Sequence, residues 1–311
     1  MTNKKLSKFF DKLFFKKWII GICQVNIKDI IRSKNFDSEI NWLIKKSFDK
    51  FYADPFPLIS NDGNIKILYE EYIFKEDYGK ISLMTIDKNF RLINNKTLLD
   101  TKSHLSYPFF FSENNKIYVF PESATNSKLS CYEYNPTNES LVFLKDILNI
   151  PLRDSTILKY DGKYWIFGAI GKNFINYKLN LFYSDDLLGT YEPHACNNTL
   201  IGLNGIRPAG NFIEVDGVLY RPAQNCKNYY GESITINKVN ELNEMNFREE
   251  PYMTIFINKK RKFNRGMHSI HTINSMDNFI VVDGEHWTFD PIRQFKKFFK
   301  NVLTRSLKTN V

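Results

Sequence analysis

Apolar and polar residues alternate in short runs along most of this 311-residue chain, and the runs recur about every 50 residues. Each repeat opens with a polar or charged residue beside a proline or a small residue. An apolar run, a tight turn and a second, aromatic-rich run follow, and this pattern predicts a β-hairpin. The repeats start at Asp54-Pro55, Tyr107-Pro108, Asp154-Ser155, Arg207-Pro208 and His268-Ser269.

The hairpin turns are marked mainly by asparagine, aspartate and glycine. They are expected at residues 61–63, 113–115, 161–162, 216–217 and 276–278. A repeat of roughly 40–50 residues is the size of one four-stranded propeller blade, and a ring of blades encloses a central channel. The sequence therefore predicts an all-β fold. We expect a five-bladed β-propeller over residues 51–288, with helical N- and C-terminal extensions over 1–50 and 289–311.

The residues that open the repeats are expected to begin the innermost strand of each blade. Closure of the ring then brings Asp54, Asp154, Arg207 and His268 to one end of the channel. This end is the candidate functional site.

Composition supports a packed β core, since 43% of residues are hydrophobic and the chain has 17 Tyr and 27 Phe. The four cysteines are far apart and form no Cys-x-x-Cys pair, which favours free thiols in a reducing cytoplasm over a disulfide framework or a metal knuckle. No secretory signal is evident, and no apolar run approaches the roughly 20 residues that span a bilayer. These features predict a cytoplasmic protein, either soluble or peripheral.

The net charge of +9 comes from the two ends of the chain. Residues 1–20 and 287–311 together carry twelve Lys and Arg against two Asp, so the body between them is close to neutral. A neutral propeller is a poor reader of a phosphate backbone, and nucleic acid is therefore not an expected partner.

Both ends have an amphipathic pattern. In residues 291–311, Phe and Leu recur at three- and four-residue spacing with basic residues between them, and residues 6–14 have the same character. Such helices can lie on an anionic membrane, which would place the protein at the inner face of the membrane. Alternatively, they pack on the propeller and their lysines form only a solvated face.

Several phrases resemble known five-bladed propellers. Residues 51–55, 153–157 and 183–189 (FYADP, RDSTI and YSDDLLG) are similar to segments of family 43 glycoside hydrolases. A closer resemblance, over roughly residues 50–285, is to the N-terminal domain family of glucosamine inositolphosphorylceramide transferase, including free-standing bacterial members. The phrases that carry it are His104-Leu105-Ser106-Tyr107-Pro108, Pro121-Glu122-Ser123, Asp154-Ser155-Thr156, Arg207-Pro208-Ala209-Gly210 and Tyr220-Arg221-Pro222-Ala223-Gln224. The resemblance implies surface-polysaccharide or glycolipid assembly.

The hydrolase resemblance implies roles for two aspartates. Asp54 matches the carboxylate that activates water, and Asp154 matches the one that positions and tunes. The position of the general acid is taken by Arg207, which cannot donate a proton near neutral pH. Glycoside hydrolysis needs two carboxyl groups beside the bond, so another strand end would have to supply the acid. The candidates are Glu122, Glu70 and Glu71.

An arginine in place of the acid suits a phosphate leaving group, which needs cations rather than a proton. Arg207 and Arg221 flank one hairpin and can converge on a single anion. His268 can donate a hydrogen bond or exchange a proton near pH 7. Further candidates for contacts with the sugar are Tyr107, Gln224, Tyr230, His271, Glu71 and Trp287. The structural alternatives are aspartates that cap turns, an arginine paired with a carboxylate such as Asp154, and histidines satisfied within a blade.

Two functions from different classes remain. One is an enzyme that acts on a phosphate-activated sugar or a glycan, with Asp54, Asp154, Glu122 and His268 as its catalytic candidates. A family 43-like hydrolase with an altered general acid is a variant of this enzyme. The other function is a non-catalytic glycan-binding propeller that works with a partner glycosyltransferase. No dinucleotide fingerprint, phosphate-binding loop or metal-ligand spacing is present, so neither a cofactor nor a metal is expected.

Overall fold

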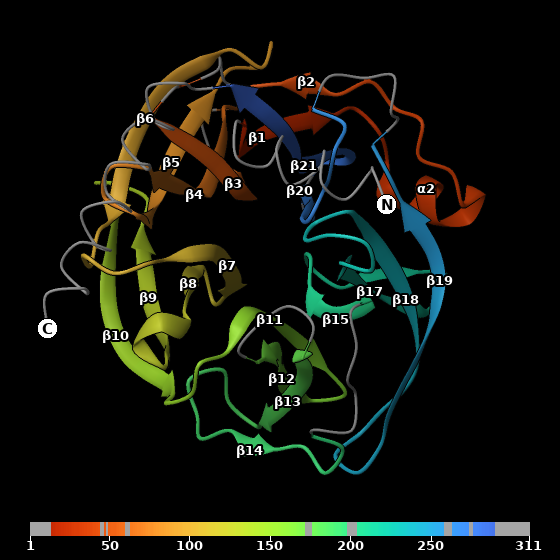
Figure 1. The fold of residues 1–311 in the computed structure, drawn as a ribbon. Helices are drawn as coiled ribbons and strands as arrows, with labels where there is room; N and C mark the ends of the chain where they lie inside the picture. Colours follow the sequence, from red (N-terminus) through yellow and green to blue (C-terminus); the bar gives the residue numbers. More distant parts are fainter. Residues whose placement is uncertain are drawn as a thin grey trace, which may run out of the picture.

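The computed structural model describes residues 14–43, 47, 49–59, 63–171, 176–197, 204–257, 263–273 and 276–289. These residues form five antiparallel sheets around a central axis (Figure 1). The predicted five-bladed β-propeller is confirmed. We call each sheet a blade. In blades 1 to 4 the innermost strand contains the start of a repeat, and in blade 5 the innermost strand begins directly after it.

Blades 1 to 3 run in chain order from the inside of the ring to its outer edge. Blade 1 contains β3 (Lys50–Ile59), β4 (Ile65–Ile73), β5 (Tyr78–Ile86) and β6 (Leu92–Leu99). Blade 2 contains β7 (Ser106–Glu113), β8 (Lys116–Ser123), β9 (Lys128–Asn135) and β10 (Ser140–Leu148), with a 3-10 turn at Ala124–Asn126. Blade 3 contains β11 (Arg153–Tyr160), β12 (Lys163–Ile170), β13 (Lys178–Ser184) and β14 (Glu192–Pro193).

Blades 4 and 5 depart from this simple order. Blade 4 contains β15 (Asn204–Pro208), β17 (Val218–Asn225), β18 (Ser233–Leu242) and β19 (Phe247–Ile255), with β16 (Ile213–Val215) also paired to β17. Blade 5 combines both ends of the propeller: β20 (Ile270–Ile273), β21 (Met276–Phe289), β1 (Phe14–Cys23) and β2 (Asn41–Trp42).

Strand β1 closes the ring. It pairs with β21 along its whole length, from Phe14 opposite Phe289 to Cys23 opposite Ile280. The prediction that residues 1–50 form a helical extension outside the propeller is therefore wrong for residues 14–23. The run from Trp18 to Cys23 is buried on both faces because β1 lies inside the sheet, between β21 and β2. A continuous apolar run of this kind is typical of a buried strand.

The remaining predictions for the two ends have mixed outcomes. A helix does occur between residues 24 and 50: α2 (Ile27–Ser33) is capped by Asn26, whose side chain accepts a hydrogen bond from the Lys28 amide. The predicted helices at residues 1–13 and 291–311 lie outside the described residues. Within the described part of the chain, no helix is long and apolar enough to cross a bilayer.

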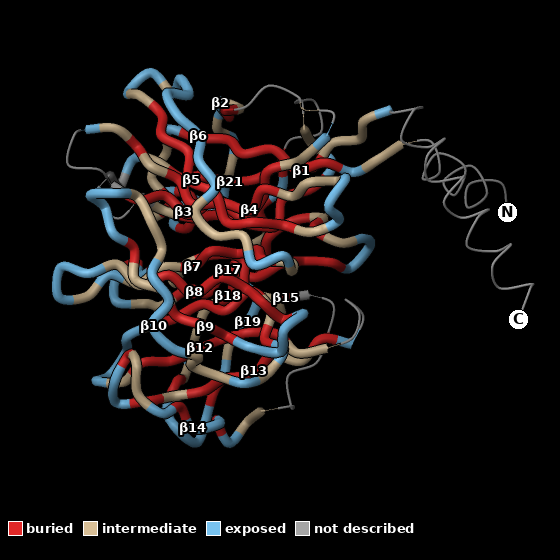
Figure 2. The backbone as a smooth tube through the Cα atoms, turned by 90° about the vertical axis from the view of Figure 1, so that its left-hand side faces the viewer, coloured by how far each residue is buried: buried red, intermediate tan, exposed pale blue. Residues whose placement is uncertain are grey.

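Three of the predicted turns are confirmed by left-handed backbone at Asn114 and Asn115, at 161–162 and at 216–217. The fifth is wrong, because Met276 already begins β21. Buried segments run through the body, whereas exposed ones lie at loops and outer edges (Figure 2). All four cysteines are free thiols.

The innermost strands of blades 1 to 3 share an irregularity where the repeats start. Asp54, Tyr107 and Asp154 have left-handed backbone, with φ of 50°, 41° and 51°, and the strand pairing shifts at each position. A residue other than glycine in this conformation costs on the order of 1–3 kcal/mol, less for aspartate, so the surrounding structure must hold it. The bulges turn these residues toward the channel end.

Buried carboxylates hold these bulges by accepting hydrogen bonds from their amides. Asp283 of blade 5 lies 3.3 Å from the Asp54 amide of blade 1, and Asp54 lies 3.2 Å from the Tyr107 amide of blade 2. Glu122 of blade 2 lies 3.0 Å from the Asp154 amide of blade 3. Each contact joins one blade to the next, so the carboxylates connect four blades around the channel.

Deleting residues 1–23, which removes β1, should abolish cooperative folding. β21 would lose one of its two partner strands, and the fully buried side chains of Ile20 and Ile22 would leave the core. Thermal unfolding followed by circular dichroism tests this, with deletion of residues 1–13 as the control that keeps β1. An unchanged cooperative transition in the longer deletion would contradict ring closure by β1.

Candidate functional site

The residues that open the repeats meet at one end of the ring. Asp54 comes from β3, Asp154 from β11, Arg207 from β15, and His268 from the segment before β20. Asp54 and His268 lie in one group of hydrogen bonds and ion pairs, and Asp154 and Arg207 lie in a second. The ring of Tyr230 lies against both groups, which we call the network, and three of the four residues are buried outright. Ring closure thus assembles residues that are more than 200 positions apart in the sequence.

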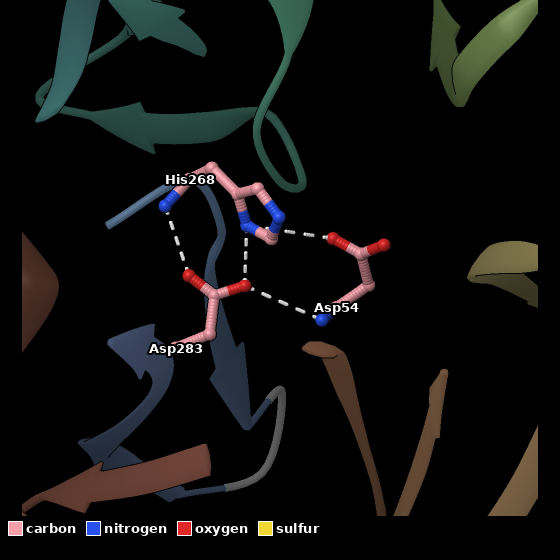
Figure 3. Close-up of side chains that lie close together, drawn as sticks. All are labelled: Asp54, His268 and Asp283. Carbon is pink, nitrogen blue, oxygen red and sulfur yellow. Dashed lines mark hydrogen bonds and ion pairs between the residues drawn. The ribbon is translucent and has the colours of Figure 1, made fainter. Parts of the chain in front are cut away.

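The first part of the network is formed by Asp54, His268 and Asp283 (Figure 3). The imidazole Nδ1 of His268 lies 2.5 Å from Asp283 Oδ2 and 3.7 Å from Asp54 Oδ1. Asp283 also accepts hydrogen bonds from the backbone amides of His268 and Ser269 and from the Ser269 hydroxyl, at 2.7–3.1 Å. Sequence reasoning missed Asp283, although a single carboxylate after the apolar run 279–282 is a signal for a buried functional or structural acid.

The charges of this trio shift one another's proton affinity. Burial alone would lower the pKa of His268, but the Asp283 and Asp54 carboxylates outweigh it and raise that pKa to about 9. Burial raises the pKa of Asp54 to about 7. The positive charge of His268 lowers this pKa, and the negative charge of Asp154 raises it further. The His268 imidazolium holds the pKa of Asp283 below its usual value despite burial. At neutral pH the trio therefore contains an imidazolium–carboxylate pair beside an aspartate that is half-protonated.

The same three side chains lie close enough together to bring one ligand atom each toward a metal ion. Their hydrogen bonds do not suit that role, however. Asp283 already accepts from four donors besides the imidazole, and a His268 that carries protons on both ring nitrogens has no lone pair for a metal. We interpret the trio as an ion pair that positions Asp54.

The second part of the network is centred on Arg207. Its Nε lies 2.5 Å from Asp154 Oδ2, and its Nη2 lies 3.8 Å from Glu122 Oε2. Gln224 donates a hydrogen bond of 2.9 Å to the same Asp154 oxygen. The guanidinium lies between two tyrosine rings, 5.2 Å from the centroid of Tyr177 and 5.3 Å from that of Tyr230. The alternative in which an arginine pairs with Asp154 therefore applies to Arg207.

Two of the three glutamates named as possible acids face this network. Burial, with the charge of Asp154, raises the pKa of Glu122 to about 8. Burial also raises the pKa of Glu70 well above its usual value, and the charges of Asp54 and Glu122 add to the effect. Glu122 can therefore hold a proton at neutral pH. Glu71 instead pairs with Lys50 at 2.7 Å and with Ser82 within blade 1, so its proposed contact with a sugar is not supported.

Three other candidates are committed to packing. Arg221 is fully buried and pairs with Glu249 and with the Gly205 carbonyl, inside blade 4, so it does not join Arg207 on one anion. His271 packs on Phe56, and burial lowers its pKa to about 3. Tyr107 is likewise fully buried and shares a hydrogen bond of 2.8 Å with Thr156. Arg221 thus lies within its own blade, whereas His271 and Tyr107 pack against residues of neighbouring blades.

Aromatic rings form one wall of the network. Trp18 of β1 stacks on His268 with ring centroids 3.8 Å apart, and Tyr230 meets both rings edge-on. Tyr230 was expected to lie in the site, whereas Trp18 was missed because β1 was taken for part of an extension. Tyr177 was missed as well, and no sequence motif marks it.

Residues 43–285 match the family described as glucosamine inositolphosphorylceramide transferase 1, N-terminal. The chain belongs to this family. It is 34% identical over 211 residues to glucosamine inositolphosphorylceramide transferase 1 of Arabidopsis thaliana, and 30% identical over 210 residues to the protein of the same name from Oryza sativa subsp. japonica. These matches cover 64% and 65% of this chain but 27% and 28% of the plant proteins, so the chain spans about a quarter of their length.

The fold is similar to that of solved glycoside hydrolases. A family 117 glycoside hydrolase from the marine bacterium Zobellia galactanivorans matches with a TM-score of 0.54 at 13% identity, over 88% of this chain and 91% of the hydrolase. A family 43 β-1,3-galactosidase matches with a TM-score of 0.52 at 12% identity, over 69% and 81%. At these identities the similarity shows the propeller fold alone. The resemblance read from the sequence is confirmed for both the family and the fold.

In this member of the transferase N-terminal family, the network contains groups that can exchange protons near neutral pH and one guanidinium beside them. Asp54, with a pKa of about 7, can accept or donate a proton near neutral pH. Arg207 is fixed by Asp154 and flanked by aromatic rings, which preorganises its guanidinium for a planar contact. Hydroxyl groups of a sugar suit the surrounding carboxylates and the amide of Gln224.

The free energy of unfolding should fall as the pH rises from about 5 to 9. A histidine whose pKa is raised from 6.5 to about 9 stabilises the fold fully below pH 6.5 and loses this contribution through pH 9. The raised pKa of Asp54 acts in the same direction between about pH 4 and 7. Denaturant unfolding across this range measures the slope.

His268→Gln should flatten the slope between pH 6.5 and 9. If His268→Gln does not fold, the His268 ring can be titrated by NMR in the unaltered protein. An imidazole that loses its proton near pH 6.5 would contradict the ion pair with Asp283.

Proposed function

We propose that this propeller binds a phosphate-linked sugar at the Asp54–Arg207 end of the channel and takes part in glycosyl transfer. The observation that carries the proposal is an arginine held by Asp154 beside carboxyl groups whose pKa values lie near neutrality. The family relationship supports it, because the plant relatives are named glucosamine inositolphosphorylceramide transferases.

In the proposed reaction, a hydroxyl oxygen of the acceptor attacks the anomeric carbon of the sugar. The bond from that carbon to the phosphate oxygen breaks, and its electron pair leaves with the phosphate. Asp54 accepts the hydroxyl proton, and Arg207 stabilises the charge on the departing phosphate. A phosphate leaves without being protonated, which suits an arginine at the position where the hydrolase resemblance implies a general acid.

A second candidate is a non-catalytic propeller that holds a glycan for a partner glycosyltransferase. This candidate is favoured by the short match to the plant relatives. About three quarters of their length lies outside the match and can contain the transferase activity that gives them their name. The buried ion pairs of the network would then serve recognition and folding only. Turnover by the isolated chain separates the two candidates.

Asp54→Asn should abolish turnover and leave ligand binding within about threefold, because the amide keeps an acceptor oxygen for the Tyr107 backbone. Arg207→Ala should weaken binding of the phosphate-bearing ligand about tenfold to a hundredfold, since charge-assisted hydrogen bonds contribute about 1.5–3 kcal/mol each. The ligand is first found by a thermal-shift screen of nucleotide sugars and sugar phosphates.

The matched control is Asp186→Asn on an exposed loop of blade 3, which should change neither quantity. Full turnover by Asp54→Asn would remove its role as the base. If the unaltered chain binds a glycan but turns nothing over, the second candidate replaces the first.

We also propose that the basic ends attach the protein to the anionic inner face of a membrane. The support is the Phe and Leu pattern of residues 291–311 among six basic side chains from Arg293 onward. Removing residues 291–311 should shift the protein from anionic liposomes to the supernatant in a sedimentation assay. Undiminished binding to the liposomes would reject this attachment.

A further inference from the structure

A second group of charged and aromatic side chains lies at the rim of the ring, directly outside the candidate site. It consists of Lys16 on β1, Trp287 on β21, and Tyr229 and Arg265 on the loops before β18 and β20. We call this group the rim cluster. Lys16 and Tyr229 are 41% and 36% exposed, and Arg265 is exposed as well, so a ligand can reach them from solvent.

The two cations of the rim cluster converge on the same aromatic ring. The Lys16 ammonium lies 5.8 Å from the Trp287 ring centroid and 5.4 Å from that of Tyr229. The Arg265 guanidinium lies 4.8 Å from the Trp287 centroid, and its carbonyl accepts a hydrogen bond from the Tyr229 hydroxyl. Cation–aromatic contacts hold the two positive groups close together although they come from distant parts of the chain.

One carboxylate lies beneath these two cations. Glu285 is 1% exposed, and its Oε2 lies 3.2 Å from the Lys16 ammonium. Its other oxygen, Oε1, has no hydrogen-bond partner among the described residues, and the indole nitrogen of Trp287 has none there either. The two cations of the rim cluster thus face one carboxylate, and two polar atoms, Glu285 Oε1 and the Trp287 indole nitrogen, make no hydrogen bond to the described residues. This combination suits an anion that also carries hydroxyl groups.

A single layer of side chains separates the rim cluster from the candidate site. Tyr229 contacts Lys16, while the adjacent Tyr230 contacts His268 and Arg207. Trp18, which stacks on His268, pairs with Glu285 across β1 and β21. The rim cluster and the candidate site therefore share the Tyr229–Tyr230 segment and the paired strands β1 and β21.

We propose that the rim cluster binds the phosphate group of the acceptor, a phosphorylated sugar or cyclitol. Lys16 and Arg265 pair with the phosphate, and the hydroxylated ring packs against Trp287 or Tyr229 with its hydroxyls near Glu285. This rests on the proposed function, in which a hydroxyl of the acceptor attacks the sugar held inside the channel. It assigns the two phosphates to different places: the donor phosphate to Arg207 and the acceptor phosphate to the rim.

Isothermal titration of the full chain with four probes tests the assignment: myo-inositol 1-phosphate, glycerophosphoinositol, myo-inositol and inorganic phosphate. The two phosphate esters should bind at least tenfold more tightly than either myo-inositol or inorganic phosphate, because only they offer both the ring and the anion. Comparable affinity for the monoester and the glycerol diester would identify a lipid head group as a suitable source. Preference for the monoester would identify a free phosphorylated ring.

Arg265→Ala and Lys16→Gln should each weaken binding of myo-inositol 1-phosphate about tenfold or more. Arg248→Ala is the matched control, since Arg248 is an exposed arginine paired with Glu241 on the far edge of blade 4. Unchanged affinity in Arg265→Ala would overturn the proposal. Inorganic phosphate binding as tightly as the esters would also overturn it, because the rim would then hold an adventitious ion only.

The variants distinguish a failure of the rim assignment from a failure of the proposed function. If Arg265→Ala weakens the esters while Asp54→Asn retains full turnover, the rim site stands and the reaction assigned to Asp54 fails. If Arg207→Ala and Asp54→Asn behave as expected but Arg265→Ala leaves ester binding intact, the rim assignment fails and the proposed function stands.

Discussion

The channel end of this propeller depends on buried carboxylates that accept hydrogen bonds from the backbone of the next blade. Asp283 holds the bulge at Asp54, Asp54 holds the one at Tyr107, and Glu122 holds the one at Asp154. Each bulge has left-handed backbone that is unfavourable without such support. The same bonds join neighbouring blades, so the geometry of the site and the closure of the ring have one common cause.

Placing so many carboxyl groups together has an electrostatic consequence. Asp54, Glu70, Glu122, Asp154 and Asp283 interact with one another in a buried region, where Arg207 and His268 supply the compensating charge. Burial disfavours ionisation, and like charges add to this effect. Protons therefore remain on some carboxyl groups at neutral pH. The carboxyl groups of Asp54 and Glu122, which hold the bulges, can thus also exchange protons near neutral pH.

Arg207 distinguishes this network from that of a glycoside hydrolase. A hydrolase places carboxyl groups on both sides of the bond that it cleaves. Here a guanidinium fixed by Asp154 faces the network, and the glutamates with raised pKa values lie on blades 1 and 2. The fold is shared with hydrolases, but fold alone does not determine chemistry. The proposed preference for an anionic ligand rests on this guanidinium.

The sequence by itself determined the number of blades, the positions of most hairpins and most members of the network, because alternating apolar residues and glycine turns are local signals. Tertiary structure decided the rest. The run at 18–23 reads alike as helix or buried strand, and only pairing with β21 made it a strand. Arg207 and Arg221 look equivalent in sequence, yet Glu249 draws Arg221 into blade 4 while Asp154 holds Arg207 at the channel. Contacts between distant strands leave no local pattern, and for that reason the pairing of Asp283 with His268, the stacking of Trp18 on His268 and the grouping of the rim cluster emerged only from the folded ring.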